Sequence, residues 1–206
     1  MKIDRLEASS HKKGRILVFF DNGSLLKITQ QELLDFGLRA GDKVTEELLE
    51  ELRAAAGRSD VKSAAADMIG RRPMSRRDLE KKLRDKGASE EGAAAAGDWL
   101  EEIGALDDRA YAALLVRHCG DLGYGPARMR EKLREKGVPR QLWDEALEQA
   151  PDTQSQIRSF LEKKLTGGAV SGKEKKRLFD ALLRRGFSWS DVKVVWTRMM
   201  GEYFED

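Results

Sequence analysis

One helical pattern occurs three times in this chain of 206 residues and ends at a glycine each time. The three segments read RRDLEKKLRDKG, ARMREKLREKG and KKRLFDALLRRG. Apolar side chains stand four and eight positions before each glycine, which places them on one face of a helix. The glycines are Gly87, Gly137 and Gly186, spaced 50 and 49 residues apart. We expect each to adopt a left-handed backbone conformation, which a Cβ atom would penalise.

A near-constant period of this length indicates a repeat protein. Each signature helix follows another helix and precedes a new capped or proline-led helix, so the repeating unit has three helices. Chance similarity among leucine- and lysine-rich amphipathic helices is the alternative, and the constant spacing argues against it. We predict a mainly α fold in which three tandem three-helix repeats, residues 58–106, 107–152 and 153–206, form an elongated arrangement.

Residues 1–57 differ from the rest of the chain and predict a small β-hairpin followed by a helix. The apolar runs near 15–20 and 24–28 flank Asn22-Gly23, a strong hairpin signal in which both turn positions take positive φ. A hairpin alone is marginally stable, so it must pack on another element. We expect a helix ending at Gly57 and a separate one from there to Pro73.

Several later helices show their start in the sequence. Ser75 and Ser171 can cap helices, each with an acidic residue three positions on. Pro126 suits the first turn of its helix. Asp107 and Asp108 could form an acid–base pair, but capping of the following helix explains them more simply.

Residues that carry chemistry are scarce. Cys119 is the single cysteine, so no internal disulfide can form and a reducing compartment fits. A nucleophilic pair of His118 and Cys119 lacks an orienting group, and Cys119 is better explained as a small buried hydrophobe. His11 lies in a polar segment. We therefore expect no enzymatic activity, no catalytic residue, no metal site and no cofactor.

Residues 167–173, GGAVSGK, imitate the first part of a phosphate-binding loop. The next position needs a hydroxyl group for magnesium, but it is Glu174, and the preceding SFLEKKLT favours a helix where the motif requires a strand. We interpret the segment as a flexible turn between helices and reject an NTPase. The chain also lacks a signal peptide and a membrane-spanning run, so we expect a cytoplasmic protein without a membrane partner. We also expect a monomer.

Charge is strongly banded although the net charge is only +2. Residues 71–86 contain eight basic and three acidic residues, residues 88–108 contain seven acidic and no basic ones, and residues 163–185 contain eight basic and two acidic ones. The banding fits a polyanionic or acidic partner, or a self-complementary, solvated surface.

The repeats place basic residues at equivalent positions off the leucine face, where stacking would align them in a row. A row of cations can follow a phosphate backbone or an acidic protein groove. The predicted partner-binding residues are Arg71, Arg72, Arg76, Arg77, Lys82, Arg84, Lys86, Lys132, Arg134, Lys136 and Arg185. We expect the tryptophans to be core residues and not base-stacking platforms; these are Trp99, Trp143, Trp189 and Trp196.

Three segments, MIGRRPMSRRDLEKKLRDKG, WLEEIGALDDRAYA and GPARMREKLREKG, resemble the signature of the RecX family, bacterial regulators of the RecA recombinase. The matching residues are Arg72, Ser75, Leu83, Lys86, Gly87, Leu106, Asp107, Asp108, Tyr111 and Ala112. The resemblance covers essentially the whole chain, and its motifs are structural.

The resemblance implies a protein that binds RecA filaments on DNA, lies along their helical groove, and restrains ATP hydrolysis, strand exchange and the coprotease activity behind the SOS response in DNA repair. The alternative is a DNA-binding module with helix-turn-helix-like repeats that acts directly on single- or double-stranded DNA.

Overall fold

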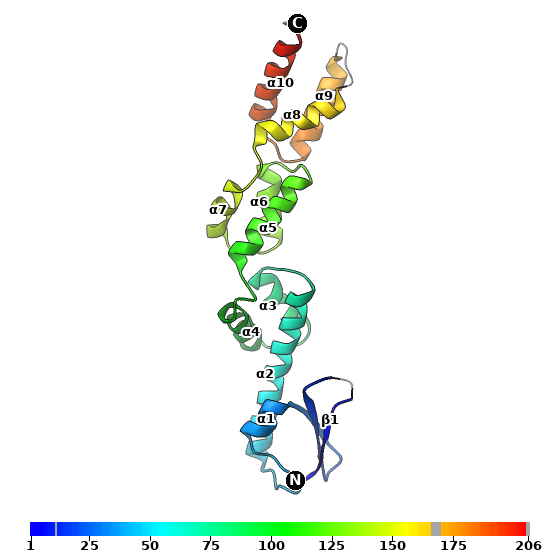
Figure 1. Cartoon of the computed structure of the whole chain (residues 1–206), viewed down its shortest axis with the longest axis vertical. Helices are drawn as coiled ribbons and strands as arrows, with labels where there is room; N and C mark the ends of the chain where they lie inside the picture. Colours follow the sequence, from blue (N-terminus) through cyan, green and yellow to red (C-terminus); the bar gives the residue numbers. More distant parts are fainter. Residues whose placement is uncertain (11, 166–169, 205–206) are drawn as a thin grey trace. The chain divides into compact units, whose positions relative to one another are not determined.

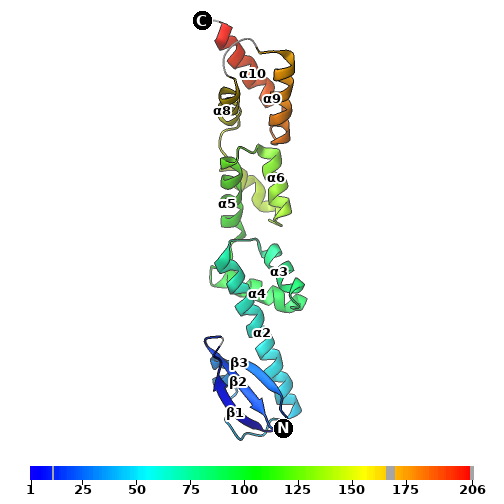
Figure 2. The same cartoon turned by 90° about the vertical axis from the view of Figure 1, so that its right-hand side faces the viewer.

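The computed structural model describes residues 1–10, 12–165 and 170–204 (Figures 1 and 2). It is mainly helical with a small N-terminal antiparallel sheet, which confirms the predicted fold class. The strands are β1 (Ile3–Ala8), β2 (Arg15–Phe20) and β3 (Leu25–Thr29). The helices are α1 (Gln30–Asp35), α2 (Glu46–Arg71), α3 (Arg76–Asp85), α4 (Glu90–Glu102), α5 (Asp108–Asp121), α6 (Pro126–Glu135), the 3-10 helix η1 (Arg140–Leu142), α7 (Trp143–Glu148), α8 (Thr153–Lys164), α9 (Gly172–Arg184) and α10 (Trp189–Phe204).

The chain forms two compact units. Unit 1 contains residues 1–72 and 79–105, and unit 2 contains residues 73–78 and 106–206. The signature helices α3, α6 and α9 each stand between two other helices in the chain, as the period predicts. The division into four segments at the expected boundaries, and the elongated arrangement, stay predictions.

The sheet of unit 1 has three strands in the order β1-β2-β3, one more than the hairpin predicted from the sequence (Figure 2). Its apolar side chains pack with residues of α2 in one core. Arg15, only 6% exposed, fixes β2 to α2 because its guanidinium lies 2.6 Å from an Asp60 carboxylate oxygen and donates to the Ser59 hydroxyl group. The extra strand β1 is charged and exposed apart from the buried Ile3 and the half-buried Leu6, so its sequence carries little strand signal.

The turn between β2 and β3 also differs from the expectation. Gly23 has φ +81°, but no residue other than glycine has positive φ in the described chain, so Asn22 does not. The Phe20 amide donates to the Ser24 carbonyl and the Gly23 amide to the Phe20 carbonyl. The loop is therefore a three-residue connection with glycine alone in the left-handed region, which is the next most common hairpin type.

The expected helix end at Gly57 is wrong, because α2, which is 26 residues long, continues through it to Arg71. Leu49 and Leu52, before the glycine, belong to the sheet core, and Ala65, after it, is fully buried. Glycine inside a helix costs only about 1 kcal/mol relative to alanine, and packing on both sides of it outweighs that cost.

Most predicted caps of the later helices are confirmed. The Ser75 hydroxyl accepts from the Asp78 amide, and Asp107 accepts from the second and third amides of α5's first turn. Ser171 and Glu174 form a reciprocal capping box at the start of α9. Pro126 is the first residue of α6. Asp108 has a different role, because its carboxylate accepts from the Arg76 amide at the start of α3.

Two equivalent positions of the repeats donate hydrogen bonds to equivalent carbonyls within unit 2, one through a hydroxyl group and one through a backbone amide. The Ser75 hydroxyl donates to the carbonyl of Lys136, the residue before Gly137. Twelve positions before Gly137, as Ser75 is before Gly87, the Gly125 amide donates to the carbonyl of Arg185, the residue before Gly186. The segment that starts a signature helix therefore meets the terminal glycine turn of the next signature helix in the chain.

Candidate interaction surface

The few residues that could carry chemistry are accounted for by structure. Cys119 is 2% exposed, and burial raises the pKa of its thiol, so the reactive thiolate is disfavoured. His118 is exposed beside it. His11 and residues 167–169 of the loop-like segment lie outside the described residues, but helix α8, not a strand, precedes that segment. No cluster of metal-ligating side chains occurs in the part of the chain that the structure describes.

Five of the predicted partner-binding residues lie in unit 1. Arg71 and Arg72 are exposed at the end of α2, and Arg84 and Lys86 are exposed at the end of α3. Lys82 is half-buried on α3. These side chains are cationic surface groups, and their role in binding stays a prediction.

The other six lie in unit 2, and several of them make contacts within the unit. Lys132 forms an ion pair with Glu135 at 2.6 Å. Arg185 is half-buried: it donates to the carbonyls of Leu122 and Gly123, and its guanidinium lies 5.1 Å from the Phe160 ring centre. The remaining four are Arg76, Arg77, Arg134 and Lys136. Of these six, only Arg134 lines a concave surface described below.

A shallow groove of about 370 Å³ runs between α6 and α9, and we name it the arginine groove. Its lining residues are Ala127, Arg128, Arg130, Glu131, Arg134, Trp143, Leu183, Arg184 and Gly186. Glu131 pairs with Arg128, and this carboxylate holds the pKa of the Arg128 guanidinium above its usual value. Arg130, Arg134 and Arg184 are exposed, so most of the cationic charge in the groove faces solvent.

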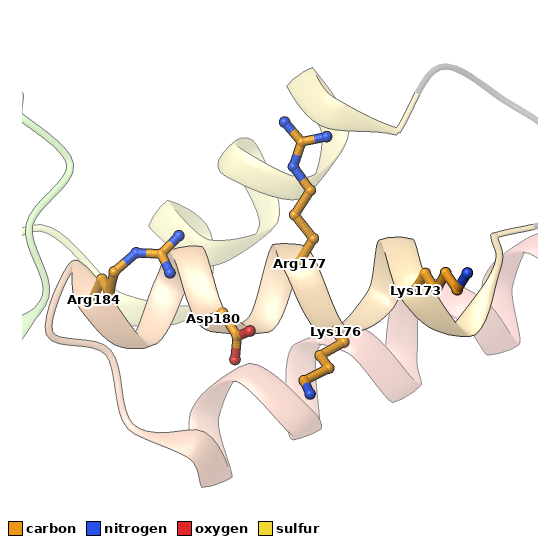
Figure 3. A pocket seen from close by; sticks show the side chains of 5 residues that line it. All are labelled: Lys173, Lys176, Arg177, Asp180 and Arg184. Atoms are coloured by element: carbon orange, nitrogen blue, oxygen red, sulfur yellow. The ribbon is translucent and has the colours of Figure 1, made fainter.

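Arg184, at the end of α9, also lines a second concave surface, which we name the α9 stripe (Figure 3). Its residues are Lys173, Lys176, Arg177, Asp180 and Arg184, and its volume is about 250 Å³. The spacing of these residues follows one helix face. Because Arg184 lines both, the arginine groove and the α9 stripe form one basic surface on unit 2.

Residue-by-residue alignment of the repeats missed most of this surface. Arg130, Lys173, Lys176, Arg177 and Arg184 were not among the predicted binding residues. The charge band of residues 163–185 contained the signal for four of them, because its cations recur at helical spacing. Arg130 had no distinguishing signal, since its place in the groove depends on how α6 lies against α9.

The tryptophans are less uniform than expected. Trp196 is buried at 7% exposure, and Trp99 and Trp143 are half-buried. Trp189 is 55% exposed, so its assignment to the core is wrong. It is the first residue of α10. Across the described residues, no helix combines the length and apolar composition needed to cross a membrane.

Comparison with known proteins places this architecture in a family. A family model for RecX, its second three-helix domain, matches residues 107–147. The regulatory protein RecX of Chlorobaculum tepidum is 35% identical over 150 residues, which cover 68% of this chain and 91% of that protein. The protein of the same name from Pseudomonas fluorescens is 35% identical over 130 residues, covering 62% of this chain and 84% of the relative.

Solved structures agree on the fold. A crystal structure of a regulatory protein RecX superposes with a TM-score of 0.74 at 24% identity and covers 95% of this chain and 98% of its own. RecX from Lactobacillus salivarius gives a TM-score of 0.63 at 20% identity, covering 69% of this chain and 96% of its own. Together with the close sequence relatives, these matches confirm the resemblance: the chain belongs to the RecX family of regulatory proteins.

Proposed function

We propose that this protein regulates the RecA recombinase by binding RecA filaments on DNA, in their helical groove, and inhibits ATP hydrolysis, strand exchange and coprotease activity. Membership of a family of regulatory proteins supports a regulator. The observation that carries the binding mode is the basic surface formed by the arginine groove and the α9 stripe. We propose that the protein acts in the cytoplasm as a monomer and without chemistry of its own.

The arginine groove has the chemistry to hold an anionic partner. Arginine presents its donors in a fixed fork that matches carboxylates and phosphates. Trp143 and Leu183 add apolar surface beside Arg134 and Arg184, which favours a partner that also buries apolar area. A RecA–DNA filament offers both acidic side chains and phosphates. Inhibition then follows if the protein binds a less active filament conformation more tightly than the active one and so shifts the population toward it.

A titration of DNA-dependent ATP hydrolysis by RecA tests this function. We expect the protein to inhibit hydrolysis at substoichiometric concentrations, because one molecule bound in a filament affects several neighbouring protomers. The measurement uses filaments preassembled on single-stranded DNA, with the rate followed against protein concentration. An unchanged rate at equimolar protein would rule out the proposed regulation.

Direct action on nucleic acid is the second candidate, and the exposed arginines of the groove favour it. A protein that acts through DNA alone should bind naked DNA as tightly as RecA-coated DNA. Its affinity should fall steeply with salt, because each neutralised phosphate releases a counterion. Tighter binding to the coated DNA at equal salt instead supports the filament as the partner.

A further inference from the structure

Trp189 is unusual among the aromatic side chains that the structure describes in unit 2. Its indole is 55% exposed at the start of α10, whereas Trp196, two turns later, is 7% exposed. A large exposed aromatic surface on a soluble protein often marks a binding site. Val194, on the same helix, is also 43% exposed.

Trp189 ends a row of three aromatic rings. The Phe179 ring from α9 meets Trp189 edge to face at 6.5 Å and Trp196 at 5.5 Å between ring centres. These contacts hold the exposed indole on the buried part of the core. The Phe179 ring of α9 therefore fixes the orientation of the exposed Trp189 indole, so a planar ligand would meet an oriented ring.

Two exposed lysines flank this row of rings. The Lys193 ammonium lies 5.1 Å from the Trp189 ring centre, and the Lys175 ammonium lies 5.6 Å from Phe179 and 5.4 Å from Trp196. Both are within cation–π distance of their rings. An anion that approaches the indole would thus find a positive charge beside it.

The α9 stripe extends the positive charge along the neighbouring helix. It has four cations and one carboxylate: Lys176 and Asp180 point to the α10 side of α9, while Arg177 points to the α8 side (Figure 3). Phosphates of an extended strand repeat along its length, so a line of cations suits them. The exposed ring and the basic line occur together in one three-helix repeat.

We propose that the third repeat contains a binding site for single-stranded nucleic acid, in which one base stacks on the face of Trp189 opposite Lys193 and the neighbouring phosphates contact Lys193 and the α9 stripe. A duplex fits less well, because its bases are already stacked inside the helix. An acidic peptide would satisfy the cations but would leave the face of the indole without a planar partner. The site requires no RecA and therefore stands or falls separately from the proposed regulation.

Binding of the full-length protein to a fluorescein-labelled oligo(dT) 15-mer, followed by anisotropy, tests the site. We expect Trp189→Ala to weaken binding about tenfold, within the range measured for loss of one base–aromatic stack. Trp189→Phe should retain most of the affinity, and Trp189→Leu should behave as Trp189→Ala, because leucine is apolar but has no π face.

Two controls separate stacking from charge. An abasic strand of equal length carries the same phosphates, so Trp189→Ala should change its binding less than twofold. Trp99→Ala removes a half-buried indole that also lies under a lysine, Lys62 at 5.3 Å, and should leave oligo(dT) binding unchanged. Replacing Lys173, Lys176 and Arg177 with Gln should make the affinity for both oligo(dT) and the abasic strand less dependent on salt concentration.

Three results would overturn the site. The first is equal affinity of the wild type and Trp189→Ala for oligo(dT), with circular dichroism showing both folded. The second is full affinity of Trp189→Leu, which would indicate an apolar contact and point to a protein partner. The third is tighter binding of a duplex than of the single strand at the same salt concentration.

Discussion

At the scale of single residues, the three terminal glycines of the signature helices share a conformation but differ in their surroundings. Gly87, Gly137 and Gly186 have φ values of +96°, +71° and +90°. A Cβ atom on Gly87 would meet nothing within 4 Å, whereas one on Gly137 would lie 3.1 Å from the Arg77 side chain. On Gly186 it would overlap the backbone nitrogen of Arg128. Only Gly186 is therefore required by packing as well as by φ, whereas Gly137 faces a side chain that can adjust.

Substitution of each glycine by alanine should show this difference in urea unfolding. Gly87→Ala should cost about 1–2 kcal/mol, the penalty of a left-handed conformation alone. Gly137→Ala should cost somewhat more, because the Arg77 side chain can move aside. Gly186→Ala should cost about 1–3 kcal/mol beyond the Gly87 value, because backbone at Arg128 must shift. Equal losses at Gly87 and Gly186 would contradict the close contact.

Positive φ at these glycines could be predicted from the sequence because it depends on local structure. The exposure of Trp189 and the internal contacts of Arg185 could not, since both depend on neighbouring elements. Arg185 reaches carbonyls more than 60 positions away in the chain, at Leu122 and Gly123. Helical periodicity places a side chain on a face, but it does not identify what covers that face.

At the scale of elements, the continuity of α2 through Gly57 reverses the expected effect of a substitution. If Gly57 ended a helix with positive φ, alanine would be strained there. Inside α2 its φ is helical and a Cβ would meet nothing within 4 Å, so Gly57→Ala should stabilise unit 1 by about 0.5–1 kcal/mol. The urea midpoint measures this change. Gly70→Ala, near the end of the same helix, is the control and should also stabilise the protein. A destabilised Gly57→Ala would indicate a break in α2.

Ser75 joins two elements through one hydroxyl group. The side chain is fully buried, caps the Asp78 amide and donates to the Lys136 carbonyl. Ser75→Ala should cost about 2–4 kcal/mol, because loss of the cap, about 1 kcal/mol, adds to about 1–3 kcal/mol for a carbonyl that loses its donor in a buried site. Ser89→Ala is the matched control: Ser89 is exposed and caps α4 through the Gly92 amide, so about 1 kcal/mol should be lost. Thermal unfolding of both variants makes the comparison, and an equal loss would mean that the bond to Lys136 contributes nothing.

The type of each element and the start of each helix could be predicted where the signal lies within a few neighbouring residues. The capping residue Ser171 and the first-turn proline Pro126 are examples. Strand β1 did not, because Asp4, Arg5 and Glu7 hide its pairing with β2. Charged side chains on an edge strand discourage aggregation, and they also remove the apolar alternation that identifies a strand. The Ser75 and Gly125 contacts required the structure, since the repeats align them but no local pattern shows what they touch.

At the scale of the whole molecule, the banded charge has two possible origins that the structure helps to separate. Some cations of the aligned row make contacts within unit 2, as Lys132 does with Glu135. Another, Arg134, is exposed in the arginine groove, next to Arg130 and Arg184, which are also exposed but do not belong to the row. A cation already in an ion pair gains less from an external anion, because it must first give up its partner. The groove should therefore contribute more to partner binding than the row.

Two variants with equal change in net charge decide between these surfaces. The groove variant changes Arg130, Arg134 and Arg184 to Glu, and the row variant changes Lys82, Lys132 and Lys136 to Glu. In the RecA ATPase titration, we expect the groove variant to raise the half-inhibitory concentration at least about tenfold, a loss on the order of 1.4 kcal/mol. The row variant should lose less than about half of that binding free energy, because Lys132 is already in an ion pair and Lys136 is half-buried. Circular dichroism must show both folded. If the row variant lost as much inhibition as the groove variant, the aligned row would be the partner surface and the arginine groove would be ordinary solvated surface.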